Sequence, residues 1–537
     1  MSHSPGKIEK PQAAFRRWLN SADPYLKPVI RCWQRFPSFA QLLLKSVSIG
    51  LAAAIFLHLA RPYLPGVYPA ERAATDWAIN FWKDRSVESP RSAERFVFLD
   101  IDESTYQQWG EQLFVPREKL LKLIQFAIEA RARLLVVDSE LTKHVGVVPI
   151  LPTGVASKSQ FLDPDETLRA YLESYSRGAL QPTAPGSADR GTVTDIIFVR
   201  SLGQPLLHAG ANGQEFDRED TTSGMPFFSE ERPSEFLETV VSPSPILHWA
   251  SSLIERDDDG VLRDWRLFEP TCIHENPNVI PSIALLAWAL LREPRLDDVP
   301  FSIQRFRTEL RRRFSPPGVQ CSHRSGLPAF EPNRTQTTAW QLDDPLLNKP
   351  VMLSMKPTDF EHRIFYKFHT DSVQADSFSH IRAGLITDPQ PGRPLSVDWL
   401  TGKIVVIGAS YAAANDLHAT PIGEMPGALV VINEMNALLE FGQIRELNPR
   451  IKWTVLVALI IAFSLSFSYF TKAWGTRVAR FVVNAILIPL SLWLFQYGWW
   501  LDVVFPLLVL QAYGQFVDFD VKSQTIKREQ IRSESQR

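Results

Sequence analysis

The residues best suited to chemistry are four aspartates and a histidine that follow apolar, strand-like runs. Carboxylates and an imidazole can bind a cation, or hold a small polar solute by charge-assisted hydrogen bonds. The alternative is that these side chains cap helices and satisfy loop amides. The ligand-binding candidates are Asp100, Asp102, Asp138, Asp416 and His418.

Two regular stretches of sequence must position these side chains. Their apolar periodicity predicts, in order, strand 96–101, a helix that begins at Pro116, strand 134–138, strand 403–408, polar loop 409–427 and helix 430–441. A strand–helix–strand order implies a parallel sheet. Ligands of such sheets bind at the carboxyl ends of the strands, so we expect the candidates to meet there.

The segment between these stretches is less regular. Residues 145–245 are rich in Pro, Gly, Ser and Thr, and predict long loops around a strand at 195–200. The Asp-rich run 257–259 with Gly260 predicts a β-turn, because it lacks the alternate ligands of a calcium loop. Residues 281–291 predict an apolar helix. The fold class is therefore α/β, with a mainly parallel sheet and long loop insertions.

Composition bounds the class of protein. The 537 residues are 45% hydrophobic and 22% charged with a net charge of −2, which excludes a disordered chain and gives no general attraction to nucleic acid. The mean hydropathy of −0.09 is typical of a soluble protein. That average hides long apolar runs, because the low hydropathy of a polar domain and the high hydropathy of several membrane helices cancel in the mean.

Four apolar runs predict transmembrane helices, one before and three after the α/β region. The first is also compatible with a cleaved signal peptide or a buried soluble helix, and the last is short for a span. Basic residues concentrate before the first run, between the second and third, and after the fourth, which places both termini in the cytoplasm. The predicted organisation is a basic cytoplasmic segment 1–38, spans 39–60, 453–470, 481–501 and 503–517, an exterior domain 61–450 and a cytoplasmic tail 518–537.

The three cysteines fit this topology. Cys32 would be cytoplasmic and reduced, whereas Cys272 and Cys321 would lie outside, where disulfides persist. They either form one disulfide or remain two buried free thiols.

An ordered set of motifs resembles the CHASE2 family of bacterial extracytoplasmic sensor domains. The resemblance covers about 61–450 apart from the long loops, and extends to one span before the domain and three after it. The residues that match the family's opening, middle and closing motifs are Asp100, Asp102, Gly110, Pro116, Arg117 and Asp138, then Asp259, Gly260 and Arg263, then Gly402, Lys403, Gly408, Ala409, Asp416, Thr420, Pro421, Pro426, Gly427 and Asn433. Val431 stands where the family helix often carries a histidine.

The resemblance implies a multi-pass protein of the bacterial inner membrane that detects an exterior stimulus, an unidentified small ligand or ion. Family members commonly continue into a cytoplasmic kinase or cyclase, whereas this tail is short, so we expect signalling through a separate protein partner. No kinase, nucleotide-binding, metalloprotease or serine-hydrolase motif is present, so we expect no enzymatic activity and no cofactor. The competing interpretation is a non-catalytic envelope scaffold; an exterior enzyme is a third, and homo-oligomerisation stays open.

Overall fold

The computed structural model describes residues 37–64, 66–83, 96–144, 163–179, 193–203, 229–252, 254–257, 259–273, 276–292, 306–308, 310–311, 341–342, 351–352, 363–369, 378–389, 398–469, 481, 483–509, 511 and 515. The chain forms two compact units. The helical unit comprises Met1–Thr75, Glu446–Phe495 and Trp499–Arg537. The sheet unit comprises Asp76–Arg445 and Gln496–Gly498.

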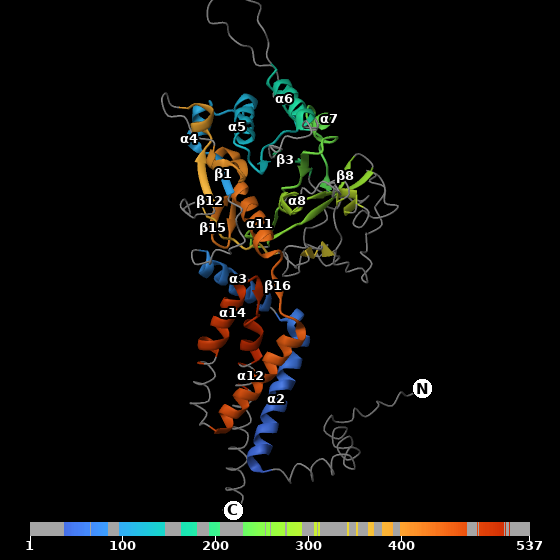
Figure 1. Cartoon of the computed structure of the whole chain (residues 1–537). Coiled ribbons are helices and arrows are strands. Elements are labelled where there is room, and N and C mark those ends of the chain that lie inside the picture. Colours follow the sequence, from blue (N-terminus) through green and yellow to red (C-terminus); the bar gives the residue numbers. More distant parts are fainter. Residues whose placement is uncertain are drawn as a thin grey trace, which may run out of the picture. The chain divides into compact units, whose positions relative to one another are not determined.

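A six-stranded parallel sheet is the centre of the sheet unit (Figure 1). Its spatial order is β12 (Phe378–Arg382), β1 (Phe96–Ile101), β13 (Ile404–Ala409), β2 (Leu134–Val137), β3 (Asp195–Val199) and β5 (Leu247–Ala250). The inner strands are buried on both faces, which explains why their sequences are continuous apolar runs rather than alternating ones. The sequence prediction of a mainly parallel sheet is confirmed.

Helices cover both faces of this sheet. On one face, α5 (Arg117–Glu129), α6 (Pro164–Ala179), α7 (Glu238–Val241) and α10 (Gly384–Thr387) accompany a large apolar core. On the other, α11 (Gly427–Phe441) packs against β1 and β13, and α8 (Ile283–Arg292) packs against β2 and β3. The approach of α11 is close, because a Cβ added at Gly408 would lie 2.3 Å from the Cβ of Ala428. Glycine at 408 therefore lets α11 lie directly on β13.

Smaller elements decorate the unit. The turn at 257–260 forms as predicted: Gly260 donates to the Asp257 carbonyl at 2.8 Å with a φ of 80°. The segment 409–427, predicted as a loop, contains a β-hairpin closed by the Thr420 hydroxyl, which donates to the Gly423 carbonyl. The remaining elements of the sheet unit are α4 (Glu103–Gln108), η4 (Asp398–Leu400), η5 (Ala412–Ala414), β4 (Ser229–Glu230), β6 (Ile254–Arg256), β7 (Leu262–Trp265), β8 (Phe268–Ile273), β9 (Asn276–Pro281), β10 (Gln341–Leu342), β11 (Val351–Met352), β14 (Leu417–Thr420) and β15 (Gly423–Pro426). Two elements, α3 (Val67–Trp82) and β16 (Arg445–Glu446), have residues in both units.

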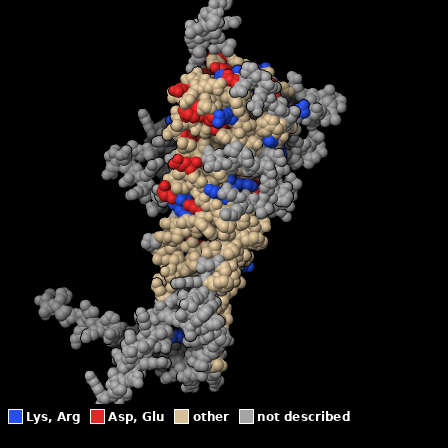
Figure 2. All heavy atoms as spheres, turned by 90° about the vertical axis from the view of Figure 1, so that its left-hand side faces the viewer, with Lys and Arg blue, Asp and Glu red and all other residues tan. Residues whose placement is uncertain are grey.

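The helical unit is built from α2 (Ser38–Ala60), η1 (Arg61–Tyr63), α12 (Pro449–Tyr469), the π-turn η6 (Val483–Leu487), α14 (Ile488–Phe495) and β17 (Trp499–Trp500). Ala54, Leu456, Ile460 and Val509 form its apolar core. Among the residues described, one helix is long and apolar enough to cross a membrane: Leu43–Ala60, with a mean hydropathy of 1.8. Figure 2 shows charged side chains over the sheet unit and almost none on the described surface of the helical unit.

The predicted spans agree with the structure only in part. α2 and α12 are helices over residues 39–60 and 453–469, but among the described helices only Leu43–Ala60 is long and apolar enough to cross a membrane, so the four spans stay a prediction. The prediction of one helix over 481–501 is wrong at its end, because the helix stops at Phe495 and the chain turns at Gly498, which has a φ of 75°. Asp502, predicted to lie in a turn, accepts a hydrogen bond from the Val504 amide at 2.9 Å and caps the next helical segment.

Of the two cysteines predicted to lie outside, Cys272 is buried on β8 and disulfide-bonded. Cys321 lies outside the described residues, so its pairing with Cys272 stays a prediction.

Candidate functional site

The strand register places two of the predicted aspartates in one row across the sheet. Asp100 on β1 pairs with Gly408 on β13, and Asp138 follows Val137, which pairs with Ile407. Side chains alternate along a strand, so Asp100, Gly408 and Asp138 face α11 together. One strand separates the two aspartates, a spacing of roughly 10 Å. The candidate residues predicted to meet at the carboxyl edge of the sheet therefore form two separate groups, a first around Asp100 and a second around Asp138.

Asp100 is the centre of the first group. It is buried, and its Oδ2 atom accepts hydrogen bonds from His380 Nε2 at 2.7 Å and Ser410 Oγ at 2.8 Å. Its Oδ1 atom is buried and has no hydrogen-bond partner among the residues that the structure describes. His380 comes from the edge strand β12, and sequence reasoning missed it because no strong apolar run marks that strand.

Asp102 has a local structural role. It is the N-cap of α4, where its Oδ1 accepts from the Thr105 amide at 2.9 Å, and its Oδ2 lies 3.3 Å from Arg382. Burial tends to raise the pKa of Asp102, but hydrogen bonds from Thr105 and Ser104 and the charge of Arg382 outweigh it and lower that pKa. This carboxylate fits the capping alternative that the sequence left open.

Asp416 and His418 lie together at the start of the β14–β15 hairpin. Asp416 Oδ1 is 2.9 Å from His418 Nε2, and the Asp416 carbonyl accepts from the Gly427 amide at 2.9 Å. A Cβ added at Gly427 would lie 2.5 Å from Asp416 Oδ2. Glycine is therefore required there, and it admits the carboxylate to the first residue of α11, where the helix dipole favours negative charge.

Asp138 belongs to the second group, with Asp416 and with Glu434, a residue that sequence reasoning missed. Glu434, in the middle of α11, is only 5% exposed. Burial, then the nearby Asp138 carboxylate, raises the pKa of Glu434 to about 8. Burial, then Asp416, raises the pKa of Asp138 to about 7. The signal that could have revealed Glu434 is an acidic residue in the middle of the mainly apolar α11, two turns after Gly427.

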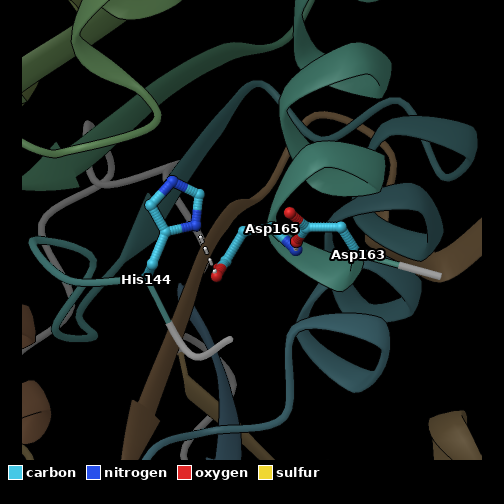
Figure 3. Close-up of side chains that lie close together, drawn as sticks. All are labelled: His144, Asp163 and Asp165. Atoms are coloured by element: carbon cyan, nitrogen blue, oxygen red, sulfur yellow. Dashed lines mark hydrogen bonds and ion pairs between the residues drawn. The ribbon is translucent and has the colours of Figure 1, made fainter. Parts of the chain in front are cut away.

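A second acidic cluster lies at the start of α6 (Figure 3). The ligand atoms of His144, Asp163 and Asp165 lie within 4.8 Å of one another, and His144 Nδ1 is 3.1 Å from Asp165 Oδ2. Asp163 caps the helix by accepting from the Asp165 amide at 3.0 Å. Asp165 Oδ1 is 3.0 Å from Nε of the buried Arg117. Both carboxylates therefore already serve the fold, Asp163 as a helix cap and Asp165 as the partner of Arg117.

Comparison with known proteins shows to which family the chain belongs. A model of the CHASE2 domain matches residues 50–468, most of the chain. The chain belongs to the CHASE2 family. CHASE2 is a family of extracytoplasmic sensor domains, which is consistent with a sensor role for the sheet unit. No curated protein and no solved structure matches the chain.

Several residues that carried the CHASE2 resemblance now have structural roles. Arg263 on β7 forms ion pairs with Asp76, Asp257 and Asp259, which tie α3 to the β6–β7 turn within the sheet unit. The Asn433 side chain accepts from the amides of Lys367 and Phe368, both at 2.8 Å. These CHASE2 positions shape the domain, whereas Asp138 and Asp416 leave carboxylates at the sheet edge.

Proposed function

We propose that this CHASE2 protein is an integral membrane sensor that detects an extracytoplasmic stimulus and signals through a separate protein partner. The observation that carries this proposal is the extent of the family match, from residue 50 within α2 to residue 468 within α12. A sensor domain joined at both ends to apolar helices is suited to transmitting a conformational change to helices in a lipid bilayer.

The proposed location is the bacterial inner membrane, with several passes and the sheet unit outside. Two observations support it: the apolar helix Leu43–Ala60 precedes the sheet unit, and basic residues concentrate in 1–38 and 518–537. We infer that these two segments are cytoplasmic and carry the contact with the partner, a kinase, a cyclase or another output protein. In this proposal the chain itself is not an enzyme.

The topology is tested by labelling single cysteines in spheroplasts with a membrane-impermeant maleimide. Leu113, on the sheet unit, is 86% exposed and suits a Leu113→Cys probe. We expect Leu113→Cys to react in intact spheroplasts and the native Cys32 to react only after permeabilisation. Labelling of Cys32 in intact spheroplasts would contradict the proposed orientation.

The partner is tested by affinity purification of the full chain from membranes, compared with a chain that lacks 518–537. A partner that is captured by the full chain and lost with the tail supports signalling through a separate protein. Recovery of the chain alone from both samples would count against it.

A further inference from the structure

The helix α3, which follows the apolar helix α2 after a short connection, exposes an uncharged face. Its exposed side chains, among those whose burial is described, recur at helical spacing: Pro69, Ala70, Ala73, Trp77 and Asn80. The Trp77 side chain is 52% exposed and lies beside the Phe81 ring, with 5.9 Å between the ring centroids. A large aromatic ring on an uncharged helix face is suited to contact with an apolar phase.

The other side of α3 is occupied by the protein itself. Its buried side chains, each at most 1% exposed, include Thr75, Ala78 and Ile79. Within the sheet unit, Asp76 forms an ion pair with Arg263 at 2.9 Å, and the Asn80 carboxamide donates to the carbonyl of Pro421 in the β14–β15 hairpin. The exposed face is therefore the part of α3 that remains for a contact outside the chain.

An ion pair holds the start of α3 at the end of α2. Arg61 directly follows α2, and its Nη2 atom lies 2.5 Å from Oε1 of Glu71 on the second turn of α3, within the helical unit. At 1.5 Å per residue, the apolar stretch Leu43–Ala60 is about 27 Å long, close to the roughly 30 Å hydrocarbon layer of a bilayer. In the proposed location, Arg61 and Glu71 therefore lie where the hydrocarbon layer meets the headgroups. Trp77 follows Glu71 on the same continuous helix, so it lies at most about 9 Å from the level of Glu71.

The side chains exposed around this point have the types that occur at membrane surfaces. Tyr63 in η1 is 85% exposed, and the last turns of α2 expose more than half of Ile55, Phe56 and Leu59. Tryptophan and tyrosine are enriched at membrane–water interfaces, because the ring enters the apolar layer while its N–H or O–H group stays hydrated. Exposed apolar side chains thus continue along the chain from α2 through η1 into α3, which favours lipid over a protein partner as the occupant.

We propose that the exposed face of α3 binds the phospholipid surface of the membrane, with the Trp77 ring at the boundary between headgroups and acyl chains. This inference rests on the proposed membrane location, and it adds an interfacial contact to the predicted spans. Because the face carries no charge, the contact depends on burial of apolar surface and not on anionic headgroups. It should therefore form with zwitterionic phosphatidylcholine alone.

The test is spin-label accessibility in the full chain reconstituted into phosphatidylcholine vesicles. Nitroxide labels are placed at Ala73→Cys and Trp77→Cys in a Cys32→Ser background, and the same background without an added cysteine gives the signal to subtract. Oxygen concentrates in lipid, whereas the neutral complex nickel ethylenediaminediacetate concentrates in water, so the ratio of the two accessibilities reports the depth of the label. Leu113→Cys, at an 86% exposed position of the sheet unit, is the control for water, and Phe56→Cys, at a 67% exposed position of α2, is the control for lipid.

We expect the ratio of oxygen to nickel accessibility at Ala73→Cys and Trp77→Cys to be at least about threefold higher than at Leu113→Cys. Ala73→Cys keeps the indole, so it decides the result if Trp77→Cys does not fold. High nickel accessibility at Ala73→Cys would place the face in water and overturn the proposal. Exclusion of both reagents there would also overturn it, because protein, such as a second copy of the chain, would then cover the face.

The label on α2 separates this inference from the proposed location. A lipid-exposed label at Phe56→Cys together with a water-exposed label at Ala73→Cys would contradict only the binding of α3 to lipid. Water-exposed labels at both positions would contradict the proposed membrane location as well.

Discussion

Two acidic clusters of the sheet unit differ in how their charge is balanced. At the start of α6, the buried Asp165 meets Arg117, whose guanidinium also donates to the carbonyl of Glu140 at 3.1 Å. At the carboxyl edge of the sheet, burial and then a neighbouring carboxylate raise the pKa values of Asp138 and Glu434. The first cluster contains a cation and stabilises the fold. In the second, the charged groups that shift the two pKa values are themselves acidic, so Asp138 and Glu434 keep their protons to a higher pH.

The largest expected effect comes from breaking the balanced cluster. Arg117→Met keeps the length of the side chain but leaves Asp165 buried without its cation. Breaking a buried ion pair on one side costs about 3–5 kcal/mol, so the melting temperature of the full chain should fall sharply. Arg177→Met, at a 72% exposed side chain on α6, is the control and should change stability by less than about 0.5 kcal/mol. Equal melting temperatures for both variants would show that Arg117 is not structural.

In the cluster at the sheet edge, a substitution should stabilise the chain, whereas Arg117→Met should destabilise it. The native pKa of Glu434, about 8, lies above its unfolded value near 4.5, so the native state retains a proton that the unfolded state has lost. Stability should therefore fall as pH rises from about 4.5 through 8. Glu434→Gln removes this loss, and we expect stabilisation of about 2–4 kcal/mol at pH 9 and little change at pH 5.

This pH comparison is read from melting temperatures of wild type and Glu434→Gln side by side. Glu440→Gln serves as the control with no pH-dependent gain. A Glu434→Gln chain that is less stable than wild type at pH 9 would mean that the ionised Glu434 has a counter-charge after all.

A smaller effect tests how closely the Asp416 carboxylate approaches the first residue of α11. In Gly427→Ala the new methyl group would lie 2.5 Å from the carboxylate, so either Asp416 or α11 must shift. Overpacking of this kind costs about 1–3 kcal/mol, which the melting temperature of the full chain measures. Gly178→Ala on α6 has nothing within 4 Å of the added Cβ and should be neutral or slightly stabilising.

The smallest effect concerns Asp102, which caps α4 and pairs with the exposed Arg382. Asp102→Ala should destabilise the chain by about 1 kcal/mol, because the Thr105 amide loses its acceptor. Asp102→Ser retains a cap and should recover most of that loss. Melting temperatures of the two variants measure the difference, and an equal loss in both would show that the cap is not what Asp102 contributes.

Sequence periodicity predicted the parallel sheet well, because strands buried on both faces are continuous apolar runs. It also brought Asp138 near Asp416, since the carboxyl ends of parallel strands share one edge. It failed for Glu434, because helical periodicity places α11 but does not say which neighbours a buried acidic side chain on it has. It failed for His380, because β12 is an edge strand whose sequence mixes polar and apolar residues.

The membrane boundaries show the same limit. The apolar run 481–501 has the length of one helix, yet the turn at Gly498 and the cap at Asp502 separate it from the next helical segment. Hydropathy averages over a window, whereas a single glycine in the left-handed region ends a helix.

The central claim is that Arg117 balances the charge of buried Asp165, whereas buried Glu434 stays protonated because burial and the Asp138 carboxylate raise its pKa to about 8. The most direct measurement is the melting temperature of the full chain at pH 5.5 and pH 9, for wild type and Glu434→Gln. The account predicts that Glu434→Gln raises the melting temperature at pH 9 and leaves it almost unchanged at pH 5.5, where the Glu434 carboxyl group is protonated. An equal change at both pH values, or a lower melting temperature at pH 9, would contradict it.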